Sequence, residues 1–290
     1  MSLLNVNDLI DKNELLLSAI RALALKLELD SCSTDEFRVQ HWAIGGQSRV
    51  YRVDLPDGRR VCLKLAGVTG TTIHLEREGY FLRILNSEQF PRLILNAACD
   101  GFIVEEWIEG IPFRLEFRSL LLRNLKVIAR DLAQMLEDLT ATNPAILHRD
   151  IKPSNLRFRH GKVVVLDFGS AEHEGTRAPV QQNRFPKLGS GTHVFQPFEQ
   201  LTSQPSQDRR VDVFAAASIM FAIMEGKPPY DNAQPGYARA LAYYKNKEEC
   251  EVFQVLKSYS PRLRTALFDA LRVNPEDRST DLWAVVNALE

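Results

Sequence analysis

The first part of the chain carries apolar residues at helical spacing. Between Val6 and Leu29 they recur every three or four positions, and Asn7 or Asp8 is suited to cap the start. The pattern predicts one amphipathic helix. Two interpretations stay open: a helix that packs on a following core or simply extends the chain, and a docking or regulatory helix.

After this helix the pattern changes to that of strands. Three strands are predicted between Phe37 and Leu65, with Gly45 and Gly46 between the first two and a Pro56-Asp57-Gly58 turn before the third. Backbone N–H groups of a glycine turn between two strands can hold phosphate oxygens. The glycine turn is therefore a candidate phosphate loop.

The rest of the chain is dominated by helical patterns. The longest predicted segments are Thr71–Asn86, Leu115–Thr142 (one or two helices) and a very apolar helix from Arg210 to Met224 that ends at Gly226. Further helices are predicted near 236–246, 261–273 and 280–289. No internal repeat, low-complexity tract or second domain is evident.

Composition narrows the class of protein. The chain has 290 residues, 45% hydrophobic and 25% charged, which is typical of a soluble globular protein with one two-lobed domain or two small ones. Its formal net charge of −1 gives no indication of nucleic-acid or anionic-membrane binding.

The cysteines and the apolar N-terminal stretch bear on the compartment. The four cysteines are widely spaced, which fits free thiols in a reducing compartment better than a zinc site or disulfide framework. Charges at Arg21, Lys26 and Glu28 interrupt the apolar stretch, so neither a membrane span nor a signal peptide is predicted. We expect a cytoplasmic protein.

Two motifs at a fixed distance carry the chemistry. The run His148-Arg149-Asp150-Ile151-Lys152-Pro153-Ser154-Asn155 is followed by a predicted hairpin and then by Asp167-Phe168-Gly169. Both motifs, at this spacing, resemble the catalytic loop and metal-binding segment of eukaryotic-type (Hanks-type) serine/threonine protein kinases. The alternative is an Asp-rich loop beside a buried strand, which leaves the second match unexplained.

The resemblance implies a role for each polar residue of these motifs. Phosphoryl transfer needs an aligned hydroxyl and cations that hold the phosphate charge. Asp150 would orient the hydroxyl and accept its proton, and Lys152 would reach the transferred phosphate, as in members directed at Ser and Thr. Asn155 and Asp167 would hold Mg²⁺ through oxygen atoms, the ligands that this ion prefers.

The resemblance also assigns the nucleotide site in the first part of the chain. Lys64 lies in Val61-Cys62-Leu63-Lys64, like the family lysine that binds the α- and β-phosphates of ATP. We choose Glu78 over Glu76 as its partner because apolar residues follow Glu78 at the family spacing. The remaining ATP contacts implied are Gly45, Gly46, Ser48, Val50, Cys62, Glu105, Glu106, Ile108 and Arg157. In the glycine turn only the middle family glycine is kept, at Gly45, with Gly46 beside it.

Two of these positions depart from the family pattern. Glu105 stands where an apolar residue or Thr is usual, and Arg157 where Leu or Met is usual. A charge in a partly dry pocket is unfavourable unless it is paired. The acid and the base therefore either meet or each find another partner nearby, and Lys64 is a competing partner for Glu105.

Later positions support the larger lobe of such a fold. Asp212 would accept backbone N–H bonds from the catalytic loop. Glu199, in Pro197-Phe198-Glu199, would pair with Arg278. Arg149 would bind a phosphate on the segment after Gly169, for which Thr176 and Ser190 are the candidate hydroxyls.

The expected fold class is α+β, with a small antiparallel sheet and one helix in the first lobe and a larger, mainly helical second lobe. Residues 1–34 would form a helical extension and 35–290 the kinase domain, with lobes of about 35–107 and 108–290. The expected function is ATP- and Mg²⁺-dependent phosphorylation of Ser and Thr in proteins, including itself. Expected partners are protein substrates and a docking partner of the N-terminal helix.

Two other functions stay open. One is a small-molecule phosphotransferase of the aminoglycoside or choline kinase kind, although these commonly have Gly in place of Arg149 and lack the long segment after Gly169. The other is a scaffold in which the kinase fold is inert, for which the altered glycine turn leaves room.

Overall fold

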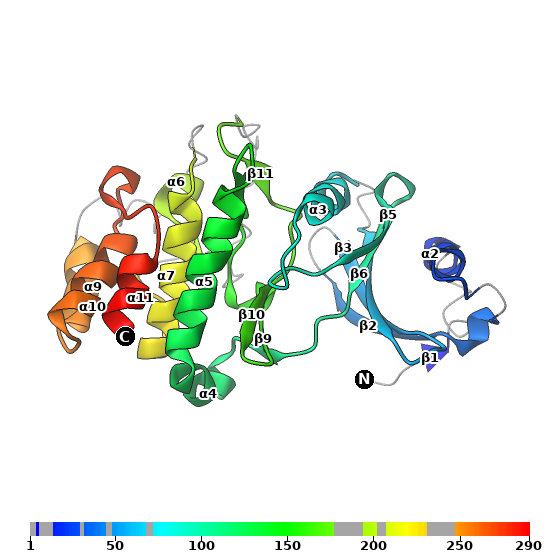
Figure 1. The fold of residues 1–290 in the computed structure, drawn as a ribbon, viewed down its shortest axis with the longest axis horizontal. Helices are drawn as coiled ribbons and strands as arrows, with labels where there is room; N and C mark the ends of the chain where they lie inside the picture. The colour runs from blue at the N-terminus through cyan, green and yellow to red at the C-terminus, as the bar shows by residue number, and fades with distance from the viewer. Residues whose placement is uncertain are drawn as a thin grey trace. The chain divides into compact units, whose positions relative to one another are not determined.

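A computed structural model describes residues 4–5, 14–29, 32–44, 48–67, 72–176, 194–201, 207–230 and 247–290 (Figure 1). The chain divides into two compact units. Unit 1 comprises Met1–Glu109 and Leu166–Ser170, and unit 2 comprises Gly110–Val165 and Ala171–Glu290. Within the described ranges, no helix has the length and apolar character needed to cross a membrane.

Unit 1 is built on an antiparallel sheet. In the described part of the chain it has the strand order β1-β2-β3-β4-β6-β5. The strands are β1 (Leu4–Asn5), β2 (Arg38–Ile44), β3 (Ser48–Asp54), β4 (Arg60–Ala66), β5 (Leu93–Ala97) and β6 (Phe102–Glu106). The predicted turn between β3 and β4 is present, and Gly58 supplies its positive φ of 83°.

Helices cover both faces of this sheet. Successive strand residues point to opposite faces, so Val61, Leu63 and Leu65 of β4 face α2 (Glu14–Lys26), whose Ile20 and Leu23 join them in one buried cluster. Helix α3 (Ile73–Ile84) packs on the other face through a cluster that includes its Leu75. Figure 1 shows α2 and α3 on opposite sides of the sheet. The N-terminal helix is thus packed on the core, which is the first of the two interpretations.

Unit 2 is mainly helical. Its helices are α4 (Arg118–Arg123), α5 (Leu125–Thr140), α6 (Phe198–Leu201), α7 (Arg210–Glu225), α9 (Lys247–Leu256), α10 (Pro261–Ala270) and α11 (Trp283–Leu289). Short antiparallel strands accompany them: β7 (Ile111–Pro112), β8 (Ile146–Leu147), β9 (Leu156–Arg159), β10 (Lys162–Val165) and β11 (Glu172–His173). The 3-10 turns of the two units are Thr34–Glu36, Ala98–Asp100, Leu115–Phe117, Pro153–Asn155 and Pro275–Asp277.

Helix α7 is the centre of unit 2, and its apolar sequence explains why. Nearly all of its residues from Val211 to Met224 are buried. The last carbonyls of a helix need donors. Arg118 supplies them, donating to the carbonyl oxygen of Ile223 at 2.8 Å and to that of Met224. Gly226, with φ of 77°, ends the helix as predicted.

The expected α+β class, with a sheet in the first part and helices in the second, is confirmed. Among the described elements that were missed are β5 and α9. β5 is short and largely part-buried, so it lacks a strong alternation signal, and α9 begins with the charged run Lys247-Glu248-Glu249. The helix predicted at 236–246 lies outside the described residues.

Candidate active site

Lys64 and Glu78 form a buried ion pair in unit 1. Lys64 Nζ lies 2.5 Å from Oε1 of Glu78, which extends from α3 toward β4. The same oxygen accepts a hydrogen bond from the backbone N–H of Phe168 at 3.1 Å. Glu76 is exposed and accepts from the Thr72 hydroxyl. The structure therefore contains the predicted pair and leaves Glu76 at the surface.

Lys64 has a second acid beside it. Glu105 Oε1 lies 2.9 Å from Lys64 Nζ, while Glu105 Oε2 is buried without a hydrogen-bond partner. Burial alone would lower the pKa of Lys64, but the two carboxylates outweigh it and raise this pKa well above its usual range. Burial, with the neighbouring acids, raises the pKa of Glu78 to about 8 against the pull of Lys64.

The Asp167-Phe168-Gly169 segment belongs to the same unit. Phe168 is fully buried, and its ring meets that of Phe90 edge-on with centroids 5.4 Å apart. His74 Nδ1 lies 2.8 Å from the carbonyl oxygen of Gly169, to which it can donate. These contacts hold the segment against α3. Asp167 has a positive φ of 69°, and its Oδ1 accepts from Gly169 N at 3.3 Å.

In unit 2 the catalytic-loop residues gather around Asp150. Lys152 Nζ lies 2.7 Å from Asp150 Oδ2. The amide nitrogen of Asn155 donates to the carbonyl oxygen of Asp150 at 2.9 Å and to its Oδ2 at 3.1 Å. The structure thus brings together Asp150, Lys152 and Asn155, and it turns the Asn155 carbonyl oxygen away from Asp150.

Asp212 fixes the backbone of this loop from the first turn of α7. Its carboxylate accepts from His148 N at 2.6 Å and from Arg149 N at 2.8 Å, as the sequence predicted. Burial raises the pKa of Asp212 to about 6, and the two backbone donors oppose that rise. Arg149 has a positive φ of 64°, an uncommon conformation for a side chain of this size. Such a residue is held in place by its surroundings.

Arg149 has a partner that the sequence analysis did not anticipate. Its Nη1 donates to Oε2 of Glu172, which is buried on β11. The available signal was that two acids, Glu172 and Glu174, follow Gly169 closely, outside the two motifs. Of the two hydroxyls proposed for phosphorylation, Thr176 is exposed and Ser190 lies outside the described residues.

Glu105 and Arg157 each have partners within their own unit. Glu105 pairs with Lys64, the competing partner named from the sequence. Arg157 donates to the carbonyl oxygens of Ser154 at 3.0 Å and Leu156 at 2.8 Å. Burial lowers the pKa of Arg157, with the charge of Arg114 adding to the effect. Carbonyl acceptors therefore take the place of a carboxylate for this guanidinium.

The other expected nucleotide contacts lie on the sheet or beside it. In the register of β3 and β4, Val50 lies opposite Lys64 and Ser48 lies opposite Ala66. Cys62 lies opposite Glu105 in the β4–β6 register. Glu106 ends β6, and Ile108, two residues later, is buried. Gly45 and Gly46 lie outside the described residues.

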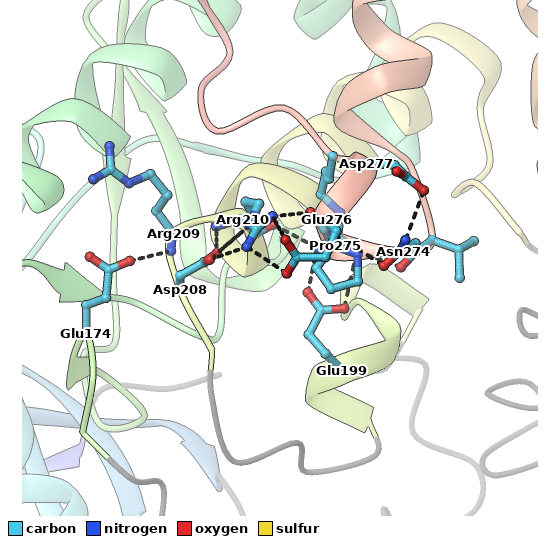
Figure 2. Close-up of polar contacts among 11 residues, drawn as sticks. Glu174, Glu199, Asp208, Arg209, Arg210, Asn274, Pro275, Glu276 and Asp277 are labelled. Carbon is cyan, nitrogen blue, oxygen red and sulfur yellow. Dashed lines mark hydrogen bonds and ion pairs between the residues drawn. The ribbon is translucent and has the colours of Figure 1, made fainter.

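The end of unit 2 is fastened by ion pairs. Arg278 Nη1 lies 2.5 Å from Oε1 of Glu199, so the predicted pair is present, and both side chains are buried. Figure 2 shows Arg210 between Asp208 and Glu276, with nitrogen–oxygen distances of 2.7 and 3.1 Å. The nearby Glu174 accepts from Arg209 N at 3.2 Å. These contacts tie α6 and the start of α7 to the segment that precedes α11.

Comparison with known proteins agrees with these features. The chain is 26% identical over 225 residues to serine/threonine-protein kinase PknA of a Nostoc species, covering 74% of this chain and 38% of that protein. It is 28% identical over 222 residues to probable serine/threonine-protein kinase PknB of Corynebacterium glutamicum, covering 71% and 33%. It is 35% identical over 220 residues to a probable serine/threonine-protein kinase of Corynebacterium efficiens, covering 71% of this chain and 32% of that protein. The chain thus spans about a third of the length of these curated relatives.

A family model adds a test that is independent of any single relative. The model of the protein kinase domain matches residues 88–289, which is more than half of the chain. The matched range contains the catalytic loop and the Asp-Phe-Gly segment. It begins after Lys64 and Glu78, whose assignment rests on their geometry. From this match and from the relatives, we conclude that the chain belongs to the protein kinase family.

Proposed function

We propose that this chain is a protein kinase that transfers the γ-phosphate of ATP to Ser and Thr hydroxyls of proteins, including itself. The observation that carries the proposal is the cluster of Asp150, Lys152 and Asn155 in unit 2, together with the buried Lys64–Glu78 pair in unit 1. The names of the relatives support serine/threonine specificity.

The proposed roles in unit 2 follow from the contacts of Asp150. The Asp150 carboxylate accepts hydrogen bonds from Lys152 and Asn155, which hold it in one orientation. A group that aligns a substrate hydroxyl needs such a fixed orientation. Asp150 would orient the substrate hydroxyl and accept its proton. Lys152, 2.7 Å from Asp150, would carry positive charge to the transferred phosphate.

In unit 1 the proposal assigns Lys64 to the α- and β-phosphates. Glu78 would fix the lysine, since a buried ammonium needs a partner. The remaining ATP contacts would come from Val50, Cys62, Glu106 and Ile108. Gly45, Gly46, Ser48 and Glu105 of unit 1 and Arg157 of unit 2 complete the proposed set.

The donor atoms fit Mg²⁺. Asp167 offers a carboxylate. Asn155 donates to Asp150 through its amide nitrogen, and its side-chain oxygen, which accepts from the Ser154 hydroxyl at 3.5 Å, has a second lone pair for a cation. Oxygen ligands from one or two side chains together with substrate phosphates are usual for this ion. When bound, Mg²⁺ would neutralise charge on the phosphates. The residues present would hold it and orient the groups around it.

The protein-directed reaction is favoured over the alternatives by Asp212 and by the Glu199–Arg278 pair. These contacts fix the catalytic loop and the end of the segment that follows Gly169. An inert scaffold would not need the charged groups around Asp150 to converge. We also propose that the protein acts in the cytoplasm. The outer face of α2, where Leu25 is 68% exposed, is the surface left for a docking partner.

One experiment separates the functions. ATP turnover is measured with a generic basic protein and again with small hydroxylated amines, in the presence of Mg²⁺. Phosphate transfer to protein Ser and Thr supports the proposal. Transfer to the amines alone would replace it with the small-molecule reaction. Turnover of neither, with intact folding, would leave the scaffold function.

A further inference from the structure

Lys64 is shared by two acids because of the strand register. Cys62 lies opposite Glu105, and Lys64 opposite Ile103, between the antiparallel strands β4 and β6. Directly opposed residues point to the same face, so Lys64 and Glu105 are diagonal neighbours on the face that α3 covers. Glu78 approaches from α3. The ammonium lies 2.5 Å from Glu78 and 2.9 Å from Glu105.

The charges of this trio balance only while one of the two acids keeps its proton, in line with the raised pKa of Glu78. Lys64, Glu78 and Glu105 are all at least nine-tenths buried, and two carboxylates face one ammonium. Glu105 Oε2 has no hydrogen-bond partner. A lone Lys64–Glu78 pair beside an apolar residue would avoid both the burial of a second acid and the unsatisfied oxygen. Stability alone therefore does not account for the acid at position 105.

We propose that Glu105 is a positioning residue that competes with Glu78 for Lys64 and restrains the ammonium until nucleotide phosphates draw it away. The inference rests on the proposed function, because it takes Lys64 as the phosphate-binding group. Phosphates that approach Lys64 must draw the ammonium away from its 2.9 Å contact with Glu105. Nucleotide therefore binds more weakly than it would with the Lys64–Glu78 pair alone.

The test compares Glu105→Gln, Glu78→Gln and the double variant. Either single change leaves one acid for one ammonium, so the two variants differ only in which acid remains. Binding of ATP with Mg²⁺ is measured by calorimetry, and KM and kcat are measured with a generic basic protein. Glu105→Gln should tighten ATP binding at least ~3-fold, seen as a lower KM, because the phosphates no longer compete with the Glu105 carboxylate for Lys64. Glu78→Gln should weaken it.

The double variant gives the distinguishing result. If Glu105 competes for Lys64, adding Glu105→Gln to Glu78→Gln frees the ammonium and restores part of the lost ATP affinity. A merely structural Glu105 would make the double variant bind more weakly than Glu78→Gln. Glu76→Gln, on the exposed side of the same helix, is the matched control and should leave ATP affinity unchanged.

Three results would overturn the inference. The first is an ATP affinity of Glu105→Gln that is unchanged or weaker than that of the wild type. If Glu105→Gln unfolds at a lower temperature than the wild type, Glu105→Leu is measured in its place, and an unchanged or weaker ATP affinity of that variant counts in the same way. The last is a double variant that binds ATP no more tightly than Glu78→Gln. Failure of the proposed function looks different. The wild-type protein would then transfer no phosphate to Ser or Thr of proteins, and if it also failed to bind ATP, both proposals would be withdrawn.

Discussion

Arg149, the residue before the proposed base Asp150, is held by the carboxylate of Glu172. Its Nη1 donates to Glu172 Oε2, and the side chains are 15% and 9% exposed. Glu172 is placed there by the pairing of β11 with β8, in which Glu172 lies opposite Leu147, next to the catalytic loop. Arg149 thus binds a carboxylate of the protein itself, whereas the sequence analysis had predicted that it would bind a phosphate.

This contact changes what we expect of phosphorylation. Because Arg149 is already paired, phosphotransfer should not require phosphate on Thr176 or Ser190, and phosphatase-treated protein should stay active. Glu172→Gln should instead lower kcat about tenfold or more, since a charged hydrogen bond is worth on the order of 1.5–3 kcal/mol. The measurement is phosphate transfer before and after phosphatase treatment, with mass spectrometry of both residues.

Glu174→Gln is the control for that variant. Glu174 lies on the same segment but accepts from Arg209 N, and it should not affect phosphotransfer. Loss of activity on phosphatase treatment, with Glu172→Gln no worse than wild type, would restore the phosphate as the partner of Arg149.

The catalytic assignments predict large losses from single changes. Asp150→Asn removes the proposed hydroxyl acceptor, Asp167→Ala a proposed Mg²⁺ ligand and Lys64→Ala the phosphate contact. Each should lower turnover by at least ~10²-fold, in line with loss of a positioned base or metal ligand. Asp138→Asn, on the exposed face of α5, is the control. Turnover near that of wild type in Asp150→Asn would disprove the role given to that residue.

Stability should depend on pH through Glu78. Its pKa rises from the ordinary 4.5 to about 8 in the folded protein, mainly through burial. An acid with a raised pKa keeps its proton in the fold while the unfolded chain has lost it. The free energy of unfolding should therefore fall as pH rises from about 4.5 to about 8 and then level off.

Glu105→Gln should flatten this dependence. Without the surplus acid, Glu78 can ionise beside Lys64 at lower pH. Urea unfolding of both proteins across that pH range, without nucleotide or metal, measures the slopes. Parallel curves would show that Glu105 does not influence the ionisation of Glu78.

Helix α2 should be part of the stable fold. Leu23 is fully buried against the sheet, whereas Leu25, two residues later, is 68% exposed. Leu23→Ala should lower the free energy of unfolding by about 2–5 kcal/mol, as buried Leu-to-Ala changes do. Leu25→Ala should change it by no more than ~0.5 kcal/mol. Equal effects of the two changes in urea unfolding would mean that α2 is not packed as described.

A side-chain contact could be predicted from the sequence where both residues belong to motifs of the protein kinase family. The Lys64–Glu78 and Glu199–Arg278 pairs and the bonds to Asp212 follow from motifs whose spacing the family fixes, and all are present. The sequence left the partner of Glu105 open between Lys64 and Arg157 and did not anticipate that of Arg149, because both depend on which side chains meet after distant strands have paired. Those strands include β8 and β11, of two residues each, which are too short to leave a periodic pattern.

Arg278 gives a final test, because its contacts need the shape of a guanidinium as well as its charge. Besides the bidentate pair with Glu199, it donates to the carbonyl oxygens of Arg272, Arg210 and Val273 at 2.8 to 3.0 Å. It also lies over the Phe214 ring, 4.9 Å from the centroid. A lysine has three donors on one atom and cannot reach all of these acceptors.

We therefore expect Arg278→Lys to be clearly destabilising although the charge is kept. Arg278→Ala should cost about 3–5 kcal/mol, because Glu199 is left buried and unpaired. Replacing both, as Glu199→Gln with Arg278→Met, should recover part of that loss, since it removes the stranded charge. Arg114→Lys, at a 71% exposed side chain, is the surface control. Urea unfolding gives all four values, and an Arg278→Lys variant as stable as this control would show that charge alone fastens this corner of unit 2.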